Sequence, residues 1–210
     1  MDGAEGAEIS MNSEPENHLT NQQVQFITSV FEHKLPVYLY GGYAEETLLH
    51  GDVTRSHHDV DFVALRKDAS DLKRELTDMG YEVAEMHEEG ADQPYKFLIK
   101  SGPVEADVAL LEWDEDRNQP YGETRTTDQS PIQVYFDKDI FNQPPLLLKD
   151  HQVHTVSPLA QMQMRSAFSE VRGGQPRSQD VEQQELLRQK FYPHDEASSK
   201  KFKPEIVTQT

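Results

Sequence analysis

The chain contains no cysteine, and this absence excludes several kinds of site. Disulfide bonds, thiolate zinc sites and a cysteine nucleophile are all impossible. Basic residues are scarce beside acidic ones, with 20 Lys and Arg against 38 Asp and Glu. The net charge of -18 argues against a nucleic-acid backbone or an anionic membrane as partner, because both need clustered cations. The acidity fits metal ions, cationic small molecules, simple solubility or adaptation to high salt.

Long apolar runs are also absent. No stretch approaches the ~18 apolar residues of a membrane helix, and the first residues carry neither a basic start nor an apolar core. We therefore expect no membrane span, no secretion signal and a cytoplasmic location, which the lack of cysteine also fits. A length of 210 residues suits one domain with tails, and residues 1–17 are expected to form a disordered acidic tail.

Apolar periodicity predicts a mixed set of helices and strands. The helices are expected at residues 19–33, 44–49, 69–79, 157–171 and 177–191. The strands are expected at residues 37–40, 59–65, 81–86, 95–100, 104–113 and 133–136, the last at an edge of the sheet. Residues 114–130 are expected to form a polar loop. Short glycine-containing connections between successive strands indicate an antiparallel-rich mixed sheet, and hence an α+β fold.

An acidic pair occupies the second predicted strand. Asp59 and Asp61 alternate with Val60 and Phe62, so the two carboxylates are predicted to share one face, roughly 6.5 Å apart. Two like charges on one face raise one of the two pKa values, and a divalent metal removes that cost. The alternative is that both acids face solvent on an edge strand.

A third acid is available on the strand predicted at residues 104–113. Glu105 and Asp107 share one face of it, and either could complete a metal site. Mg²⁺ prefers carboxylate oxygens and keeps water molecules for substrate phosphates, so three acids near a glycine turn suit phosphoryl or nucleotidyl transfer. One of these groups could also take a proton from an attacking hydroxyl.

The glycine turn is formed by Gly41 and Gly42, between an apolar strand and a helix. Its backbone N–H groups and the helix N-terminus can hold phosphate oxygens, although such a pair also forms plain turns. Tyr43 is considered as a stacking surface for a base or an acceptor. Arg55 suits either a phosphate contact or a structural ion pair, whereas His57 is expected to hydrogen-bond to the site or the turn, because imidazole is a poor Mg²⁺ ligand.

These residues form two motifs, Gly41-Gly42-Tyr43-Ala44 and Thr54-Arg55-Ser56-His57-His58-Asp59-Val60-Asp61. Together they resemble the signature of the aminoglycoside and lincosamide nucleotidyltransferase-like family, within the DNA polymerase beta-like superfamily. The resemblance runs from residue 20 to about residue 190. It implies a minimal nucleotidyltransferase fold, a mixed sheet flanked by helices. The implied domains are a core at 18–145 and a small helical C-terminal part of the acceptor cleft at 146–192, between tails at 1–17 and 193–210.

The resemblance also implies roles for individual residues. Asp59 and Asp61 match the metal-binding pair, and Asp107 matches the third acid, as metal ligand, general base or both, with Glu105 as the alternative. The residues that match the nucleotide-binding positions are Gly41, Gly42, Arg55 and His57.

The implied reaction is Mg²⁺-dependent, with two ions, and moves a nucleoside monophosphate from ATP or another NTP onto a hydroxyl of a small molecule. An aminoglycoside or lincosamide is the expected acceptor, and the protein is expected to be a monomer or homodimer. Glu45-Glu46 and Asp107-Val108-Ala109-Leu110 depart from the family pattern on the acceptor side. The alternatives are a non-catalytic nucleotide-binding regulatory or antitoxin-like protein, or a nucleotidyltransferase with a protein acceptor.

Overall fold

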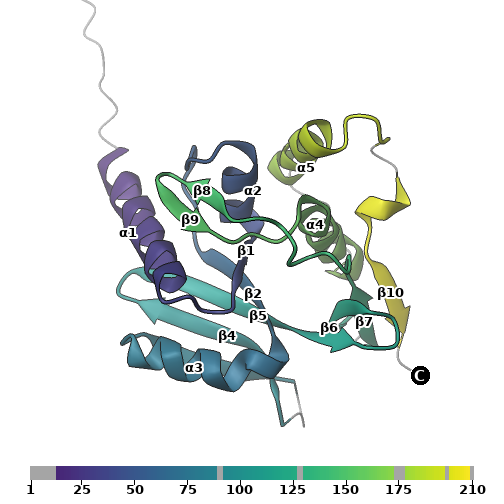
Figure 1. Cartoon of the computed structure of the whole chain (residues 1–210), viewed down its shortest axis with the longest axis horizontal. Coiled ribbons are helices and arrows are strands. Elements are labelled where there is room, and N and C mark those ends of the chain that lie inside the picture. The colour runs from purple at the N-terminus through teal and green to yellow at the C-terminus, as the bar shows by residue number, and fades with distance from the viewer. Residues whose placement is uncertain (1–12, 89–91, 127–129, 173–177, 197–198, 209–210) are drawn as a thin grey trace, which may run out of the picture.

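The computed structural model describes residues 13–88, 92–126, 130–172, 178–196 and 199–208 (Figure 1). The helices are α1 (Ser13–Glu32), α2 (Gly41–Leu49), α3 (Ala69–Asp78), α4 (Pro158–Arg172) and α5 (Ser178–Phe191), with short 3-10 turns η1 (Arg66–Asp68) and η2 (Lys200–Phe202). The strands are β1 (Tyr38–Tyr40), β2 (Val60–Leu65), β3 (Glu82–His87), β4 (Pro94–Ser101), β5 (Val104–Asp114), β6 (Gln119–Arg125), β7 (Pro131–Tyr135), β8 (Leu146–Leu148), β9 (His151–Val153) and β10 (Glu205–Thr208).

Eight strands form one sheet that is organised around β5. The first part of β5 lies between β2 and β4, and its last residues pair with β6. Strand β2 runs parallel to β5, whereas the other pairs in the sheet are antiparallel. The parallel register places Asp61 beside Asp107. The expected α+β fold with an antiparallel-rich mixed sheet is confirmed.

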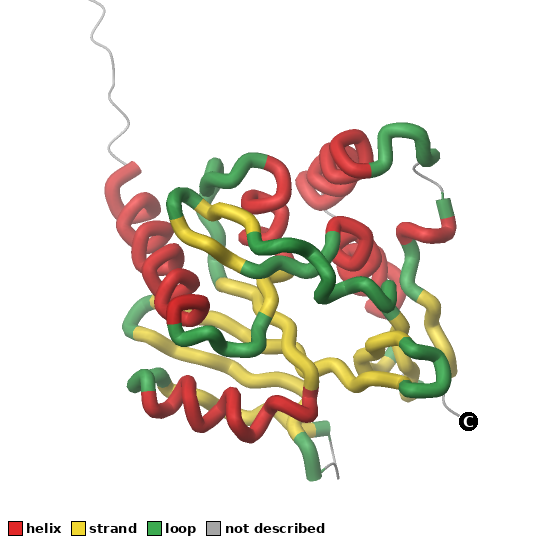
Figure 2. Tube along the Cα trace, viewed as in Figure 1, coloured by secondary structure: helices red, strands yellow, loops and turns green. Residues whose placement is uncertain are grey.

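The two faces of the sheet have different coverings. Helices α1 and α3 pack on one face of the sheet (Figure 2). There, Phe62 of β2 contacts Phe26 and Phe31 of α1, with ring centroids 6.1 Å apart in each pair. On the other face, Val63 and Leu111 pack with residues of β7 and α4. Because side chains alternate along a strand, burying Phe62 against α1 turns Asp61 toward the other face.

The C-terminal helices lie together, away from α1 and α3 (Figure 1). Leu48 of α2, Met162 of α4 and Leu187 of α5 form a separate apolar cluster with Phe202 of η2. This cluster fixes α4 and α5 against α2, the helix that begins at the predicted glycine turn.

Several elements differ from the sequence-based expectations. Strand β6 lies within residues 114–130, which were expected to be a loop, and β7 is not at an edge because β6 and β10 flank it. The short hairpin of β8 and β9 was not predicted. These segments have little apolar alternation, so their backbone pairing depends on neighbouring strands more than on local propensity.

Both predicted tails include residues that form secondary structure. Helix α1 begins at Ser13, within the expected tail at 1–17, and residues 1–12 lie outside the described part of the chain. Residues 205–208 of the expected tail at 193–210 form β10, which pairs with β7. The expectation of a trailing C-terminus is therefore wrong at β10, while the predicted boundary at 145–146 remains a prediction.

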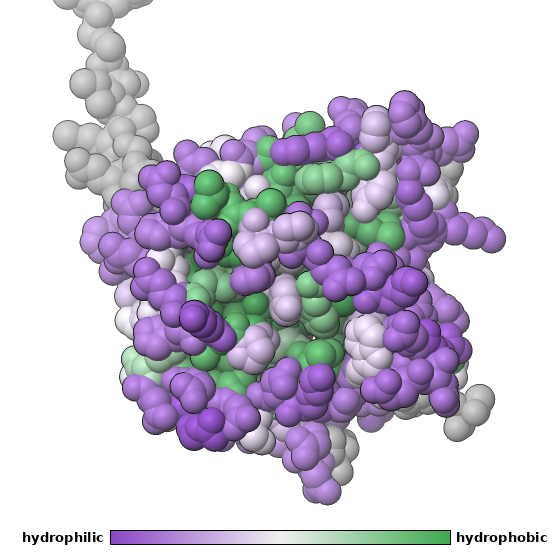
Figure 3. Space-filling model, viewed as in Figure 1, coloured by the Kyte–Doolittle hydropathy of each residue, from purple (hydrophilic) through white to green (hydrophobic). Residues whose placement is uncertain are grey.

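The surface is hydrophilic around its rim, with hydrophobic side chains gathered in the middle of the viewed face (Figure 3). Among the helices of the described ranges, none combines the length and apolarity needed to cross a bilayer.

Candidate active site

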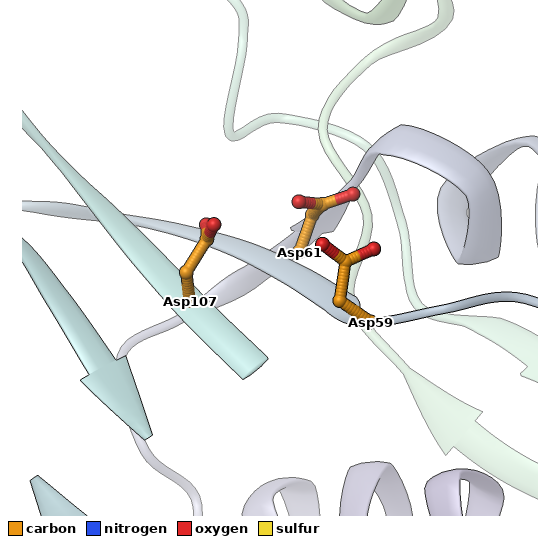
Figure 4. A group of neighbouring side chains, drawn as sticks. All are labelled: Asp59, Asp61 and Asp107. Carbon is orange, nitrogen blue, oxygen red and sulfur yellow. The ribbon is translucent and has the colours of Figure 1, made fainter. Parts of the chain in front are cut away.

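Three carboxylates converge on the face of the sheet opposite α1 and α3 (Figure 4). Asp59 lies in the bend directly before β2, Asp61 is the second residue of β2, and Asp107 projects from β5. One oxygen from each residue lies within 4.8 Å of the others. We call these three residues the acidic triad.

Asp107, and not Glu105, completes the acidic triad. Both residues lie on the same face of β5, but Glu105 is exposed and sits one step nearer the start of the strand. Its carboxylate lies 3.4 Å from the ammonium of Lys100 on β4. The parallel pairing of β2 with β5 instead sets Asp107 directly beside Asp61.

Ionisation of Asp61 is opposed by its surroundings. Burial, followed by the negative charges of Asp107 and Asp59, raises the pKa of Asp61 to about 7, although Arg165 and Lys96 counteract this rise. A carboxylate with such a pKa lacks compensating positive charge. An oxygen-only donor set of this kind suits a hard divalent cation, which would supply that charge.

Two further side chains contact Asp107. The Lys96 ammonium on β4 forms an ion pair with it, and the Tyr40 hydroxyl donates a hydrogen bond to Oδ1 at 3.4 Å. Burial raises the pKa of Asp107, and the Lys96 contact opposes this rise. The pKa of Tyr40 lies well above its usual value because of burial and then the nearby acids, so its hydroxyl remains a donor. Lys96 was not predicted as a site residue, although the alternation of side chains along the strand predicted at 95–100 indicates which face it occupies.

Gly41 allows Asp61 to approach the backbone. Its φ is +68°, and a Cβ atom at this position would lie 2.2 Å from Asp61 Oδ2. Its N–H donates to Gln161 Oε1 at 3.0 Å, and its carbonyl accepts from Gln161 Nε2 at 3.2 Å. Gly41 of the expected glycine turn is thus the first residue of α2, and its N–H is already bonded to the side chain of Gln161 on α4, which no sequence motif indicated.

Gly42 provides the equivalent space for His57. A Cβ atom here would lie 2.3 Å from His57 Nδ1, and the His57 ring also lies against the ring of Tyr43, with centroids 4.5 Å apart. The side chain of His57 is only 5% exposed. Tyr40, at the N-cap of α2, makes no side-chain capping hydrogen bond, and the close approach of Gly41 to Asp61 sets the start of this helix beside the acidic triad.

Buried ion pairs connect α2 to α4. Glu45 is fully buried and accepts from Arg165 Nε at 2.7 Å and from Arg165 Nη2 at 3.0 Å. Arg55 lies 3.3 Å from Glu45 and 3.2 Å from Glu46. Of the two roles considered for Arg55, the structure shows the structural ion pair. Glu45, a departure from the family pattern, orients α4 beside the acidic triad.

Tyr43 does not reach the site. Its side chain is 1% exposed, and its hydroxyl donates to Gln23 Oε1 of α1 at 2.8 Å. Stacking of Tyr43 on a base or an acceptor, the alternative considered from the sequence, is excluded because the helical start at Gly41 turns this ring into the core.

An apolar cleft adjoins the acidic triad. It has a volume of about 230 Å³. Its lining residues come from β1, β5, β6, α4 and the end of β7: Tyr40, Ala109, Leu111, Gly122, Glu123, Thr124, Val134, Phe136, Met164, Ala167 and Val171. Tyr40 both lines the cleft and bonds to Asp107, and Ala109 follows Asp107 on the same face of β5.

Comparisons with known proteins give a family match and a shared fold. A family model described as aminoglycoside-2''-adenylyltransferase matches residues 24–187. The solution structure of the antibiotic-resistance factor ANT(2'')-Ia superimposes with a TM-score of 0.59 at 19% identity, covering 83% of this chain and 86% of that one. The same protein in complex with adenylyl-2''-tobramycin gives a TM-score of 0.56 at 18% identity, covering 84% and 91%.

A lincosamide enzyme shares the same fold. The lincomycin-bound adenylyltransferase LnuA superimposes with a TM-score of 0.54 at 20% identity, covering 81% of this chain and 97% of that one. A search of curated proteins finds no match. The family match and the shared fold confirm the resemblance to antibiotic nucleotidyltransferases.

Proposed function

The chain belongs to the aminoglycoside-2''-adenylyltransferase family, and we propose that it transfers AMP from ATP onto a hydroxyl of a small-molecule antibiotic in a Mg²⁺-dependent reaction. The observation that carries this proposal is the convergence of the acidic triad beside the start of α2. The acidic triad supplies metal ligands, and the start of α2 supplies backbone N–H donors for phosphate oxygens.

The acidic triad fits a divalent metal by its chemistry. Asp59, Asp61 and Asp107 offer only carboxylate oxygens, the ligands that Mg²⁺ prefers, and the raised pKa of Asp61 reflects missing positive charge. When bound, Mg²⁺ would neutralise phosphate charge and act as a Lewis acid.

The residues of the chain position the donor. The start of α2, at Gly41 and Gly42, presents the positive end of a helix dipole to an anionic triphosphate. The backbone bond between Gly41 and Gln161 holds that helix start in place. Two side chains support the same segment: His57 packs against Gly42, and Arg55 pairs with Glu45 and Glu46.

Asp107 serves the acceptor. It accepts the proton of the attacking hydroxyl, whose oxygen forms a bond to the α-phosphorus while the bond from that phosphorus to the bridging oxygen breaks. Pyrophosphate leaves with the electron pair of the broken bond. Pyrophosphate leaves at the start of α2, whereas Asp107 lies on β5, on the other side of Asp61. The attacking hydroxyl and the leaving group of an in-line displacement therefore occupy separate places.

The test is direct transfer. The protein is incubated with Mg²⁺, ATP or GTP, and either tobramycin or lincomycin, and the products are followed by mass. We expect an acceptor with one added nucleoside monophosphate, together with pyrophosphate, and no product in EDTA. Mg²⁺-dependent ATP binding without modification of any small molecule would contradict the small-molecule acceptor and favour a protein acceptor. Failure to bind ATP would contradict the proposed function.

A further inference from the structure

The apolar cleft beside Asp107 is not required by donor or metal binding, and its lining indicates what enters it. Most of its wall is aliphatic or aromatic, and its exceptions are one carboxylate, one threonine hydroxyl and the Tyr40 hydroxyl. Two of these three groups are engaged. The Tyr40 hydroxyl donates to Asp107, and Glu123 lies 3.5 Å from the guanidinium of Arg66.

We propose that the cleft binds an uncharged apolar segment of the acceptor, so that the preferred acceptor is a hydroxyl compound with an alkyl or aryl part and few amines. This inference rests on the proposed function. The cleft volume of about 230 Å³ lies below the roughly 300–1,000 Å³ of pockets that enclose a whole drug-sized ligand. It therefore accommodates one segment, while the hydroxyl remains outside at Asp107.

Position favours the acceptor over the donor nucleotide. The cleft begins at Ala109, one step along the face of β5 from Asp107, the carboxylate that faces the attacking hydroxyl. A nucleobase would bring several hydrogen-bonding atoms into the cleft, where Thr124 is the main polar group not already engaged by Asp107 or Arg66. Burying such atoms without hydrogen-bond partners is unfavourable, whereas an apolar segment has no such groups to leave unpaired there.

Charge disfavours a polycationic acceptor at this point. Glu123 is the single carboxylate of the cleft lining, and its charge is shared with Arg66, which also lies 3.0 Å from Glu112. Lys96, which lies beside the cleft residue Ala109 in the pairing of β4 with β5, forms the ion pair with Asp107 and adds a positive charge. Within the cleft lining, an ammonium group of the acceptor would meet no carboxylate other than Glu123, despite the net charge of -18 on the whole chain.

The experiment compares two acceptors on the full-length enzyme with Mg²⁺ and ATP. Lincomycin carries an alkyl chain and a single basic amine, whereas tobramycin carries several amines. We expect a higher kcat/KM and tighter binding for lincomycin. A wild-type enzyme that binds or uses tobramycin as well as lincomycin, or that binds neither, overturns the proposal.

A cleft-filling variant identifies the occupant. Ala167→Leu adds bulk to the cleft from α4 and is expected to raise the KM for lincomycin at least about tenfold, the effect of a methylene or two in an apolar pocket. The KM for Mg²⁺-ATP should stay within about twofold of wild type, which also shows that the variant folds. The matched control Ser70→Leu adds the same side chain at an exposed site on α3 and should change neither value.

The outcomes separate the two proposals. If Ala167→Leu weakens ATP binding and leaves the lincomycin KM unchanged, the cleft holds the nucleobase and the apolar-acceptor proposal is wrong, while the proposed function stands. If the wild type neither binds nor turns over Mg²⁺-ATP, the proposed function fails and this inference fails with it. The comparison of lincomycin with tobramycin on the wild type does not depend on the folding of any variant.

Discussion

Asp61 is held in a place where its own ionisation opposes folding. Its pKa is about 7 in the folded protein, against 3.8 for an unperturbed aspartate. A group whose folded pKa is raised contributes stability below its unfolded pKa, and that stability is lost as the pH rises through the folded pKa. In the absence of metal, the Asp61 carboxyl therefore makes the free energy of unfolding smaller as the pH rises from about 4 to about 7.

Asp61→Asn tests this linkage. In EDTA at pH 8, the variant should unfold at higher urea concentration than wild type, with a free energy of unfolding about 1–3 kcal/mol larger, and the gain should shrink at pH 5.5. Glu105→Gln, which changes an exposed acid on the same face, should leave stability nearly unchanged at both pH values. A variant less stable than wild type at pH 8 would show that the Asp61 charge is compensated in the folded protein.

Gly41 is constrained by both its backbone conformation and the approach of Asp61. Gly41→Ala should destabilise the protein by more than about 2 kcal/mol, because the new Cβ would combine strain with a clash. Gly102→Ala is the matched control, since its φ is +59° and nothing lies within 4 Å of the added Cβ. It should cost only about 1 kcal/mol, the strain alone. Equal losses in urea unfolding would mean that the contact with Asp61 does not contribute.

At the scale of single residues, the sequence predicted the acidic triad but not all the side chains that surround it. Alternation located Asp59 and Asp61, and parallel pairing of their strand with β5 selected Asp107 over Glu105. The choice between the two acids needed the register, which depends on long-range pairing. Gln161 was undetectable, because a glutamine in a helix carries no local signal of the backbone it bonds.

Helix α2 depends on α4 through a buried ion pair. Glu45 and Arg165 share two hydrogen bonds, and Arg165 also lies 3.4 Å from Asp180 of α5. Removing Arg165 would leave the buried Glu45 carboxylate with the more distant Arg55 and the uncharged Gln161 as partners. The pair therefore couples the start of α2, and with it the donor site, to the C-terminal helices.

Arg165→Met should lower the free energy of unfolding by about 3–5 kcal/mol, because Glu45 remains buried without its main partner. Arg74→Met on α3 is the control. Its ion pair with Asp71 spans 2.7 Å, but the Arg74 side chain is 59% exposed, so the expected loss is below about 1 kcal/mol. Similar losses in the two variants, measured by urea unfolding, would contradict the role assigned to the buried pair.

Elements with strong local patterns were predicted well, and those formed by tertiary pairing were not. Helices α3 and α4 fall close to their expected bounds, since apolar periodicity and flanking signals agree. Strands β6 and β10 contain Gln119, Glu123 and Glu205 among few apolar residues. They form because β7 offers pairing on both sides, a property of the sheet that no local window contains.

The whole molecule carries a net charge of -18, and a divalent cation would act on it in two ways. Added Mg²⁺ should raise the melting temperature by specific binding at the acidic triad and by general screening. Specific binding should be stronger at pH 8 than at pH 6, because Asp61 must lose its proton, and its pKa is about 7.

Thermal unfolding at both pH values checks this prediction. NaCl of equal ionic strength provides charge screening alone, and Asp61→Asn removes one carboxylate of the acidic triad. The rise in melting temperature should exceed that in NaCl for wild type and for Glu105→Gln, and should match it for Asp61→Asn. An equal response of all three proteins would indicate that Mg²⁺ acts only through the surface charge.

The rate of nucleotide transfer in triad variants tests the central claim most directly. Pyrophosphate release from ATP is measured with Mg²⁺ and whichever of lincomycin and tobramycin the wild type modifies. Asp59→Asn, Asp61→Asn and Asp107→Asn should each lower the rate by at least about 100-fold, and Glu105→Gln should stay within about twofold of wild type. Full activity in Asp107→Asn, or an equal loss in Glu105→Gln, would contradict the assignment of the acidic triad as the catalytic site.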